Sequence, residues 1–309
     1  MLEREFTSAR LRAVWETGTG HDAVLWARLA DMGVLSMMLP EADGGMGGDL
    51  IDTILLVEEL GRAAVPGPVF ETMTVGALAL RGTPWASGVV DGSVAVAAAL
   101  MGERYVAHAD VAALVLLADH ETVRALEVSQ LQVDHVEGID GGRRLATLSG
   151  TEGMGHFLAV DREGATDAGS LAAAAYLLGL SSRMLTIAGD YARDRRQFGQ
   201  PIGSFQAVKH LMADALLKVE FARPAVYRAA WSHASGAETR ARDVSMAKAL
   251  ASEAAQKAAR SALQVHGAIG YTWECDLQLF MKKAWALMPA WGSASFHRRR
   301  VSDSVLGPR

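Results

Sequence analysis

Residues 191–199 read Tyr-Ala-Arg-Asp-Arg-Arg-Gln-Phe-Gly, and Pro201-Ile202-Gly203 and Phe205-Gln206 follow them closely. An apolar run with helical spacing precedes the stretch, and Phe-Gly-x-Pro is unsuited to continuing a helix. We therefore expect Arg193, Arg195 and Arg196 to gather where a long helix ends. Guanidinium groups match phosphate oxygens and stay charged at any working pH, so this cluster suits a diphosphate. The alternative is a simple helix cap, because the helix dipole favours cations at its C-terminus.

A second segment, at residues 264–268, reads Gln-Val-His-Gly-Ala and closes an alanine-rich helical run. Glycine after the last helical residue is an ordinary C-terminal signal. His266 is expected to cap carbonyls or to pack in the core, because no second histidine or carboxylate stands at ligand spacing. The sequence therefore predicts no metal site and no catalytic role for His266.

Taken together and in this order, the two segments resemble those of the acyl-CoA dehydrogenase flavoprotein family. In that family the arginine segment and a Gln-x-x-Gly-Gly stretch reach across a dimer interface to the adenosine diphosphate half of the partner's FAD. The resemblance implies FAD as the cofactor and a binding set of Arg195, Arg196, Gln197, Phe198, Phe205, Gln206, Gln264, Val265, His266, Gly267 and Ala268. Ala268 stands where the family has glycine, and its methyl group reduces the close backbone approach that glycine allows.

The chain divides into three parts by its hydrophobic period. The patterns predict an N-terminal helical domain at residues 1–85, a small β domain at residues 86–165 and a C-terminal four-helix bundle at residues 166–309. The predicted fold is therefore mainly α with a reduced β middle domain, similar to that of acyl-CoA dehydrogenases. The glycine-dense loop at residues 44–48 is not a phosphate loop, because no strand precedes it and no Gly-Lys-Ser/Thr follows. Leu39-Pro40-Glu41 and Glu58-Glu59-Leu60-Gly61 resemble segments of the family's first domain that are mainly structural.

Individual elements can be placed from the same patterns. Runs with strand character predict about five or six strands, around residues 94–100, 111–117, 131–133, 144–148 and 157–160. The bundle helices are expected at residues 168–193, from 205 onward, at 239–265 and at 275–287. Pro224 is expected to kink or divide the second of these helices. In the third, alanines form the buried stripe and Lys248, Glu253 and Lys257 lie off it.

The catalytic base of the family has no counterpart in this sequence. Oxidation of an acyl-CoA requires a carboxylate that removes the α-proton while hydride leaves the β-carbon for the flavin. Most members supply it from a Tyr-Glu-Gly-Thr-like sequence, which here reads Ala-Trp-Gly-Ser at residues 290–293 and puts Trp291 at the base position. Others place it in the first bundle helix, where this chain has Gly169 or Ser170. A positioned base contributes roughly 10²- to 10⁴-fold, so no catalytic residue is predicted in this chain.

The middle part also lacks the glycine- and serine-containing segment with which family members bind the flavin ring. The chain thus resembles the short subunit of actinobacterial α₂β₂ acyl-CoA dehydrogenases, which implies a longer partner chain that supplies the catalytic glutamate. It also implies an acyl-CoA substrate, including steroid-derived ones, and electron-transfer flavoprotein or a similar acceptor. Two alternatives remain open: a self-sufficient enzyme with a relocated base such as Glu163, and a helical scaffold that no longer binds flavin.

Composition sets wider limits. The 309 residues carry a net charge of −5, with 30 basic and 35 acidic residues spread along the chain, so nucleic acid is not an expected partner. Cys275 is the single cysteine, which fits a reducing cytosol. No secretory signal is visible, and no uncharged apolar stretch reaches the ~20 residues that span a bilayer, so a cytoplasmic protein without a membrane span is expected.

Overall fold

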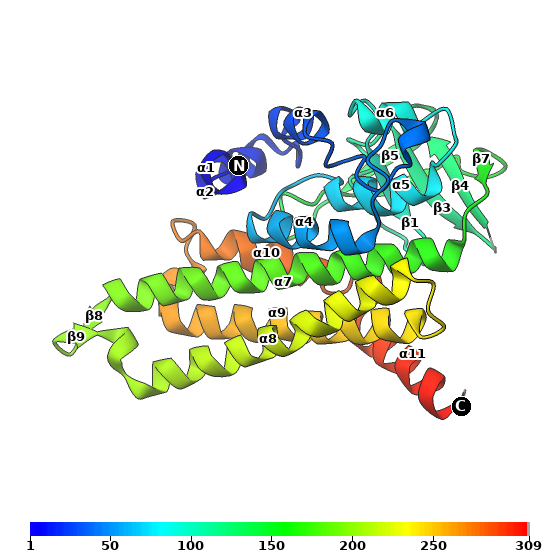
Figure 1. Cartoon of the computed structure of the whole chain (residues 1–309). Coiled ribbons are helices and arrows are strands. Elements are labelled where there is room, and N and C mark those ends of the chain that lie inside the picture. Colours follow the sequence, from blue (N-terminus) through cyan, green and yellow to red (C-terminus); the bar gives the residue numbers. More distant parts are fainter. Residues whose placement is uncertain (121, 308–309) are drawn as a thin grey trace.

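The computed structural model describes residues 1–120 and 122–307. Its N-terminal part is helical and lies against one side of the long bundle helices (Figure 1). The elements are α1 (Leu2–Glu5), α2 (Ser8–Thr17), α3 (Ala23–Asp31), η1 (Glu41–Asp43), α4 (Leu50–Arg62), η2 (Glu71–Gly76), α5 (Ala77–Ala79) and α6 (Ala86–Val90). Aspartates fix two of the helix starts, because Asp22 accepts a hydrogen bond from the Leu25 amide and Asp49 forms a reciprocal capping box with Asp52.

Helix α4 packs directly on α7 (Arg162–Asp194), and two glycines make the close crossing possible. A Cβ atom at Gly179 would lie 1.9 Å from the Glu58 carbonyl oxygen, and one at Gly61 would lie 2.2 Å from the Tyr176 carbonyl oxygen. Any larger residue would force the helices apart. The Glu-Glu-Leu-Gly sequence that ends at Gly61 therefore serves the fold, as the sequence indicates.

The middle part contains β1 (Val96–Ala99), β2 (Val106–Ala107), β3 (Leu114–Asp119), β4 (Thr122–Glu127), η3 (Val128–Gln130), β5 (Gln132–Val136), β6 (Leu145–Ser149) and β7 (His156–Leu158). One sheet has the order β1-β3-β4-β7, with β1 parallel to β3 and the other pairs antiparallel. The other sheet is antiparallel, in the order β2-β6-β5. Strands β2 and β4 were not predicted, because β2 is only two residues long and β4 carries Arg124 between its buried Val123 and Ala125.

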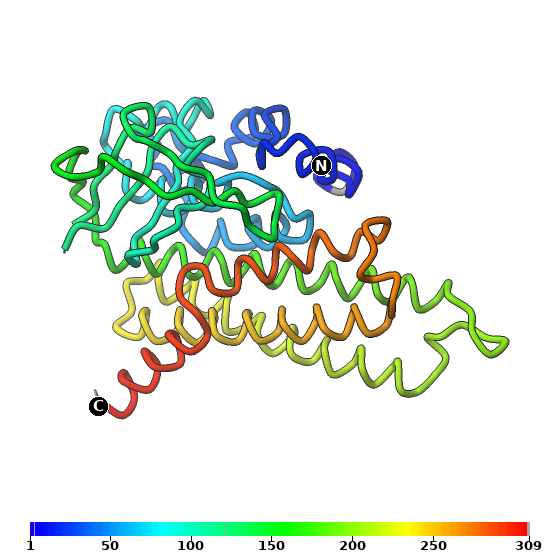
Figure 2. Tube along the Cα trace, turned by 180° about the vertical axis from the view of Figure 1, so that it is seen from behind, coloured from blue at the N-terminus to red at the C-terminus, as the bar shows by residue number. Residues whose placement is uncertain are grey.

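The C-terminal part is a bundle of α7, α8 (Gln206–Ala234), α9 (Arg240–His266) and α10 (Leu277–Leu287), and Figure 2 shows it from behind. Every residue from Leu171 to Leu180 is buried, so this stretch of α7 is surrounded by neighbours on all sides. Helix α7 is long and apolar enough to cross a membrane, but 78% of its most apolar window is buried inside the protein. That burial is typical of a core helix.

Three expectations for the bundle need correction. Pro224 does not divide α8, which runs unbroken through it. Its neighbours are held from outside the helix, because the Glu58 carboxylate accepts hydrogen bonds from both Arg223 and the Tyr227 hydroxyl. Lys248 is not on the outer face of α9 but fully buried. A further helix, α11 (Ala294–Leu306), packs on α9 and was not predicted.

Candidate functional site

The arginine segment forms a hairpin at one end of the bundle. Strands β8 (Arg196–Gln197) and β9 (Gln200–Pro201) join α7 to the short η4 (Ile202–Ser204) and α8. Both views show this hairpin projecting beyond the helices (Figures 1 and 2). The Arg195 backbone is fixed on both sides, since its amide donates to Tyr191 at 2.8 Å and its carbonyl accepts from Ile202 at 2.8 Å. The side chains of Arg195, Arg196 and Gln197 remain exposed.

Phe198 stands at the tip of this hairpin. Its side chain is 92% exposed, and its φ of 51° lies in the left-handed region that non-glycine residues rarely adopt. It lies edge-on to Phe205, the N-cap of α8, with ring centroids 6.1 Å apart. A fully exposed aromatic residue on a strained turn indicates a contact surface for something outside this chain.

The second segment lies at the same end of the bundle. The ring of His266, the last residue of α9, stacks on Tyr191 of α7 with centroids 4.4 Å apart and planes 17° apart. His266 Nδ1 lies 2.8 Å from the Ala262 carbonyl oxygen. This stack joins the helix that carries the arginines to the helix that carries Gln264. The expectation that His266 packs and caps carbonyls is therefore confirmed.

The predicted binding residues divide into two groups. Val265 and His266 are 7% exposed and turn inward, so only their backbone groups can reach a ligand. The other residues of the second segment, and Gln206 at the start of α8, are exposed: Gln264, Gly267, Ala268 and Gln206. Exposed guanidinium and amide groups at one end of the bundle form a donor set that fits the diphosphate and adenosine of FAD.

Trp291, which the sequence resemblance matches to the family's base position, is buried to 3% exposure. Its indole lies on Gly169 of α7 so closely that a Cβ atom there would be 2.4 Å from the ring. Gly169 and Trp291, the two positions that the sequence resemblance matches to the family's base, therefore lie in contact, and the indole fills the space between them. Neither indole nor a glycine accepts a proton at neutral pH.

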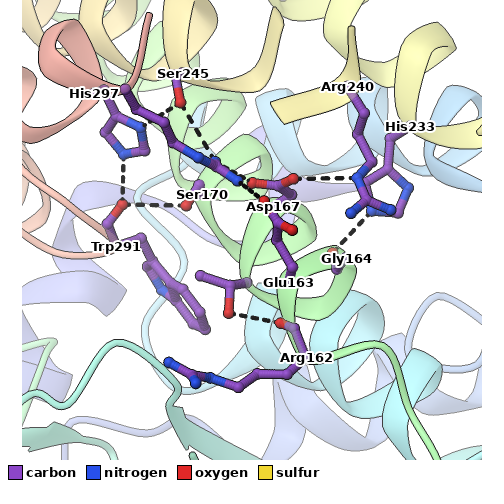
Figure 3. A network of polar contacts seen from close by, with 12 residues as sticks. Arg162, Glu163, Gly164, Asp167, Ser170, His233, Arg240, Ser245, Trp291 and His297 are labelled. Carbon is purple, nitrogen blue, oxygen red and sulfur yellow. Dashed lines mark hydrogen bonds and ion pairs between the residues drawn. The ribbon is translucent and has the colours of Figure 1, made fainter. Parts of the chain in front are cut away.

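Backbone hydrogen bonds hold Trp291 in place, as Figure 3 shows. Its carbonyl oxygen accepts from Ser170 Oγ at 3.2 Å and from His297 Nε2 at 2.8 Å. Burial lowers the pKa of His297 to about 4, so its ring is neutral and the Nε2 hydrogen is the donor. The Ser245 hydroxyl lies 3.2 Å from Nδ1 and completes the pairing.

Lys248 supports the same loop from α9. Its Nζ donates to the carbonyls of Met288 at 2.9 Å and Gly292 at 3.0 Å and to Ser252 Oγ at 3.3 Å. Burial lowers the pKa of this amine to about 7. The lysine thus spans the loop on both sides of Trp291, whose φ of 56° is strained.

Glu163, the acid considered for a relocated base, lies on the first turn of α7. Its carboxylate is 62% exposed and pairs with Arg300 at 2.6 Å. The fully buried acid nearby is Asp167, which pairs with Arg240 at 3.2 Å (Figure 3). It also pairs with Arg300 at 2.5 Å. Both carboxylates are thus neutralised by arginines of α9 and α11.

Sequence reasoning did not identify Lys248, His297 or Asp167 as parts of this region. Lys248 lies off the alanine stripe of α9 and looks solvent-facing by period alone. The acid and arginine partners come from three helices far apart in sequence, so no local spacing joins them. No group of His, Cys, Asp and Glu in the described residues could hold a metal ion.

Comparisons with known proteins agree with this architecture. The family model for the acyl-CoA dehydrogenase C-terminal domain matches residues 162–306, and that for the N-terminal domain matches residues 2–85. Acyl-CoA dehydrogenase IpdE2 of Mycolicibacterium smegmatis is 33% identical over 311 residues, covering 99% of this chain and 96% of that protein. IpdE2 of Mycobacterium tuberculosis is 36% identical over 282 residues, covering 89% of this chain and 85% of that protein.

Solved structures are similar along the whole chain. The Tcur3481-Tcur3483 steroid ACAD superposes with a TM-score of 0.91 at 27% identity, covering 99% of this chain and 94% of that one. The ChsE4-ChsE5 complex from Mycobacterium tuberculosis has a TM-score of 0.85 at 24% identity, covering 100% and 94%, and shows the shared fold. Since family models match both ends and a relative aligns along nearly its full length, the chain belongs to the acyl-CoA dehydrogenase family of FAD-dependent oxidoreductases.

Proposed function

We propose that this chain is one subunit of a heteromeric acyl-CoA dehydrogenase, and that this subunit does not carry the catalytic carboxylate. In this role it grips the diphosphate and adenosine of an FAD whose reacting ring lies in a longer partner chain, and the partner supplies the catalytic glutamate. The observation that carries the proposal is the indole of Trp291, packed on Gly169 where either form of the base would stand.

The outward direction of the arginine hairpin supports the same conclusion. The hairpin projects past the end of its own bundle (Figure 1), and Phe198 at its tip is 92% exposed. Arg195 makes no ion pair with the residues that the structure describes. Exposed donors at a projecting tip suit a dinucleotide that belongs to a neighbouring chain better than one held within the same chain.

The reaction assigns separate tasks to the two chains. FAD, when bound, accepts the hydride that leaves the β-carbon of the acyl group. In this chain Arg195 and Arg196 balance the diphosphate charge, and the amide of Gln264 supplies hydrogen bonds to the same half of the cofactor. The Tyr191–His266 stack holds the two segments together, so the donors are positioned before the cofactor binds.

Several finer assignments belong to the same proposal. The similar structure named as a steroid ACAD supports a steroid-derived acyl-CoA, and the one named as the ChsE4-ChsE5 complex supports an α₂β₂ assembly. Electron-transfer flavoprotein or a similar acceptor would reoxidise the flavin. We place the complex in the cytoplasm, with domains at residues 1–85, 86–165 and 166–309.

Replacing Arg195 in the co-purified complex tests whether this chain binds the diphosphate of the FAD. Co-expression with the product of the adjacent reading frame should give a yellow heteromer. Arg195→Gln removes a charge-assisted contact worth about 1.5–3 kcal/mol, so FAD should bind about 10- to 100-fold more weakly. Arg193→Gln is the matched control, because Arg193 belongs to the same basic run but pairs with Asp190 on its own helix. Equal FAD affinity for both variants would contradict the proposal.

Two further variants separate the alternatives. If Glu163 were a relocated base, Glu163→Gln would lower dye reduction by roughly 10²-fold or more, whereas the proposal predicts little change. If the chain were a scaffold without a cofactor role, Arg195→Gln would leave the flavin content of the complex unaltered. The exposed, ion-paired state of Glu163 favours the proposal over the first alternative.

A further inference from the structure

Helix α2 of the N-terminal part contacts the chain just after the second predicted FAD-binding stretch. That stretch, residues 264–268, leads into η5 (Gly267–Tyr271), and Trp273 follows shortly afterwards, before α10 begins. Arg12 and Trp15 lie one turn apart on α2 and therefore share one face of that helix. Both side chains reach Trp273, so the N-terminal part touches the bundle beside this stretch.

The contacts between α2 and this part of the bundle are aromatic and ionic. The rings of Trp15 and Trp273 lie with centroids 6.2 Å apart. The Arg12 guanidinium lies over the Trp273 ring, 5.2 Å from its centroid, and donates to Asp276 Oδ1 from Nε at 3.2 Å and from Nη2 at 2.7 Å. Lys282 Nζ of α10 lies 5.4 Å from the Trp15 ring and 5.7 Å from the Trp273 ring. We call these side chains the α2 cluster.

The α2 side of this cluster is fixed by the rest of the fold. A Cβ atom at Gly141 would lie 2.9 Å from the Trp15 ring, and one at Gly142 would lie 3.2 Å from its Nε1. The Gly142 amide in turn donates to the buried Asp140 carboxylate at 2.9 Å. Trp15 is therefore packed tightly against the middle part, whereas Trp273 is 47% exposed and depends on the α2 cluster for its position.

The segment between α9 and α10 makes mainly local hydrogen bonds. The Thr272 amide and hydroxyl donate to the Ile269 carbonyl at 3.0 and 2.9 Å, and the Cys275 amide donates to the Thr272 carbonyl at 3.3 Å. Such bonds shape turns but do not tie the segment to another part of the fold. At its start the stack of His266 on Tyr191 supplies that tie, and at its end the α2 cluster does.

We propose that Trp273 is a positioning residue for the FAD-binding stretch at residues 264–268. Through the α2 cluster it holds η5, so that the Gln264 amide and the backbone of Gly267 and Ala268 keep one arrangement before the dinucleotide binds. This inference rests on the proposed function and adds the N-terminal part to it. Without the cluster, FAD would have to order η5 as it binds, and ordering about one backbone residue corresponds to a roughly tenfold loss of affinity.

Amide hydrogen exchange of the full chain, without FAD or partner, tests the positioning itself. Trp273→Ala should speed exchange across residues 267–272 by about tenfold or more, because the segment then opens locally. Trp231→Ala is the matched control. Trp231 is also 47% exposed and also carries a cation over its ring, Arg228 at 4.3 Å, but it lies near the C-terminal end of α8. Equal exchange of residues 267–272 in Trp273→Ala and the unmodified chain would overturn the proposal.

FAD affinity of the co-purified complex tests the consequence. Trp273→Ala should weaken FAD binding about tenfold and Trp231→Ala should not. Trp273→Phe should restore most of the affinity, because a smaller ring still lies against Trp15 and under Arg12. Arg12→Gln leaves both tryptophan rings in place and should weaken binding about threefold, so it tests the cluster even if Trp273→Ala does not fold.

The same titrations separate this inference from the function on which it rests. If Arg195→Gln weakens FAD binding while Trp273→Ala and Arg12→Gln bind FAD as the unmodified complex does, the positioning role is refuted and the proposed function stands. If Arg195→Gln leaves FAD affinity unchanged, the proposed function fails and the positioning role fails with it. Weaker binding by Trp273→Phe equal to that of Trp273→Ala would also contradict the role of the aromatic contact.

Discussion

Truncation of Trp291 tests whether its buried indole fills the position that the sequence matches to the family's base. The side chain is 3% exposed and touches Gly169 across the bundle, so Trp291→Ala removes a fully buried indole. Such truncations cost about 3–5 kcal/mol. For a helical part of this size that loss corresponds to a melting temperature lower by roughly 10 °C. Trp291→Gly removes the same ring but also relieves a backbone held at φ of 56°, which costs a non-glycine residue about 1 kcal/mol.

The melting temperatures of Trp291→Ala and Trp291→Gly should therefore stand in the reverse of the usual order. Glycine in an ordinary helix is less stable than alanine, but here the glycine variant should melt a few degrees above the alanine variant. Trp231→Ala is the control, because Trp231 is 47% exposed on α8 and its loss should cost below about 1 kcal/mol. Calorimetric melting of the three proteins measures the difference. A Trp291→Ala protein as stable as the control would show that the indole does not fill the base position.

Two further predictions concern buried charge. Burial holds the pKa of Glu71 near 7 against an ordinary 4.5, so the folded chain keeps a proton that the unfolded chain has released, and stability falls as pH rises from 4.5 to 7. Glu71→Gln should therefore stabilise the protein by about 3 kcal/mol at pH 8 and hardly at pH 4. Urea unfolding that gave the same increase in unfolding free energy at both pH values would refute this. Asp167→Asn should cost about 3 kcal/mol, because it leaves Arg240 and Arg300 without their buried anion, whereas Asp161→Asn, 59% exposed, should cost below about 1 kcal/mol in the same assay.

The division into helical, β and helical parts could be predicted because hydrophobic period is a local property. The burial of α7 on all sides between residues 171 and 180 follows directly from the run of alanine and leucine there. The prediction that Pro224 could divide α8 was wrong, and the residues beside it are tied to Glu58, which lies far away in sequence. The expectation that proline interrupts a helix holds for an isolated helix, whereas here Glu58 of α4 binds the residues on both sides of Pro224.

The two candidate segments could be found from the sequence because each is a short local motif. The arginine hairpin and the end of α9 are such motifs, and the Tyr191–His266 stack brings them to one end of the bundle. Lys248 and Glu71 could not be found in this way. Lys248, which lies beside the alanine stripe, looks exposed until the loop at residues 288–292 closes over it. Glu71 is buried only because segments distant in sequence, among them residues 138–145 and Trp291, pack beside it.

The most direct test of the account is the bleaching of FAD by acyl-CoA thioesters under anaerobic conditions, measured with the purified chain alone and with its partner chain added. We predict no bleaching by the chain alone, even with FAD in excess, and bleaching at least 10²-fold faster once the partner is present. Rapid bleaching by the isolated chain would show that it carries its own base and would contradict the central claim.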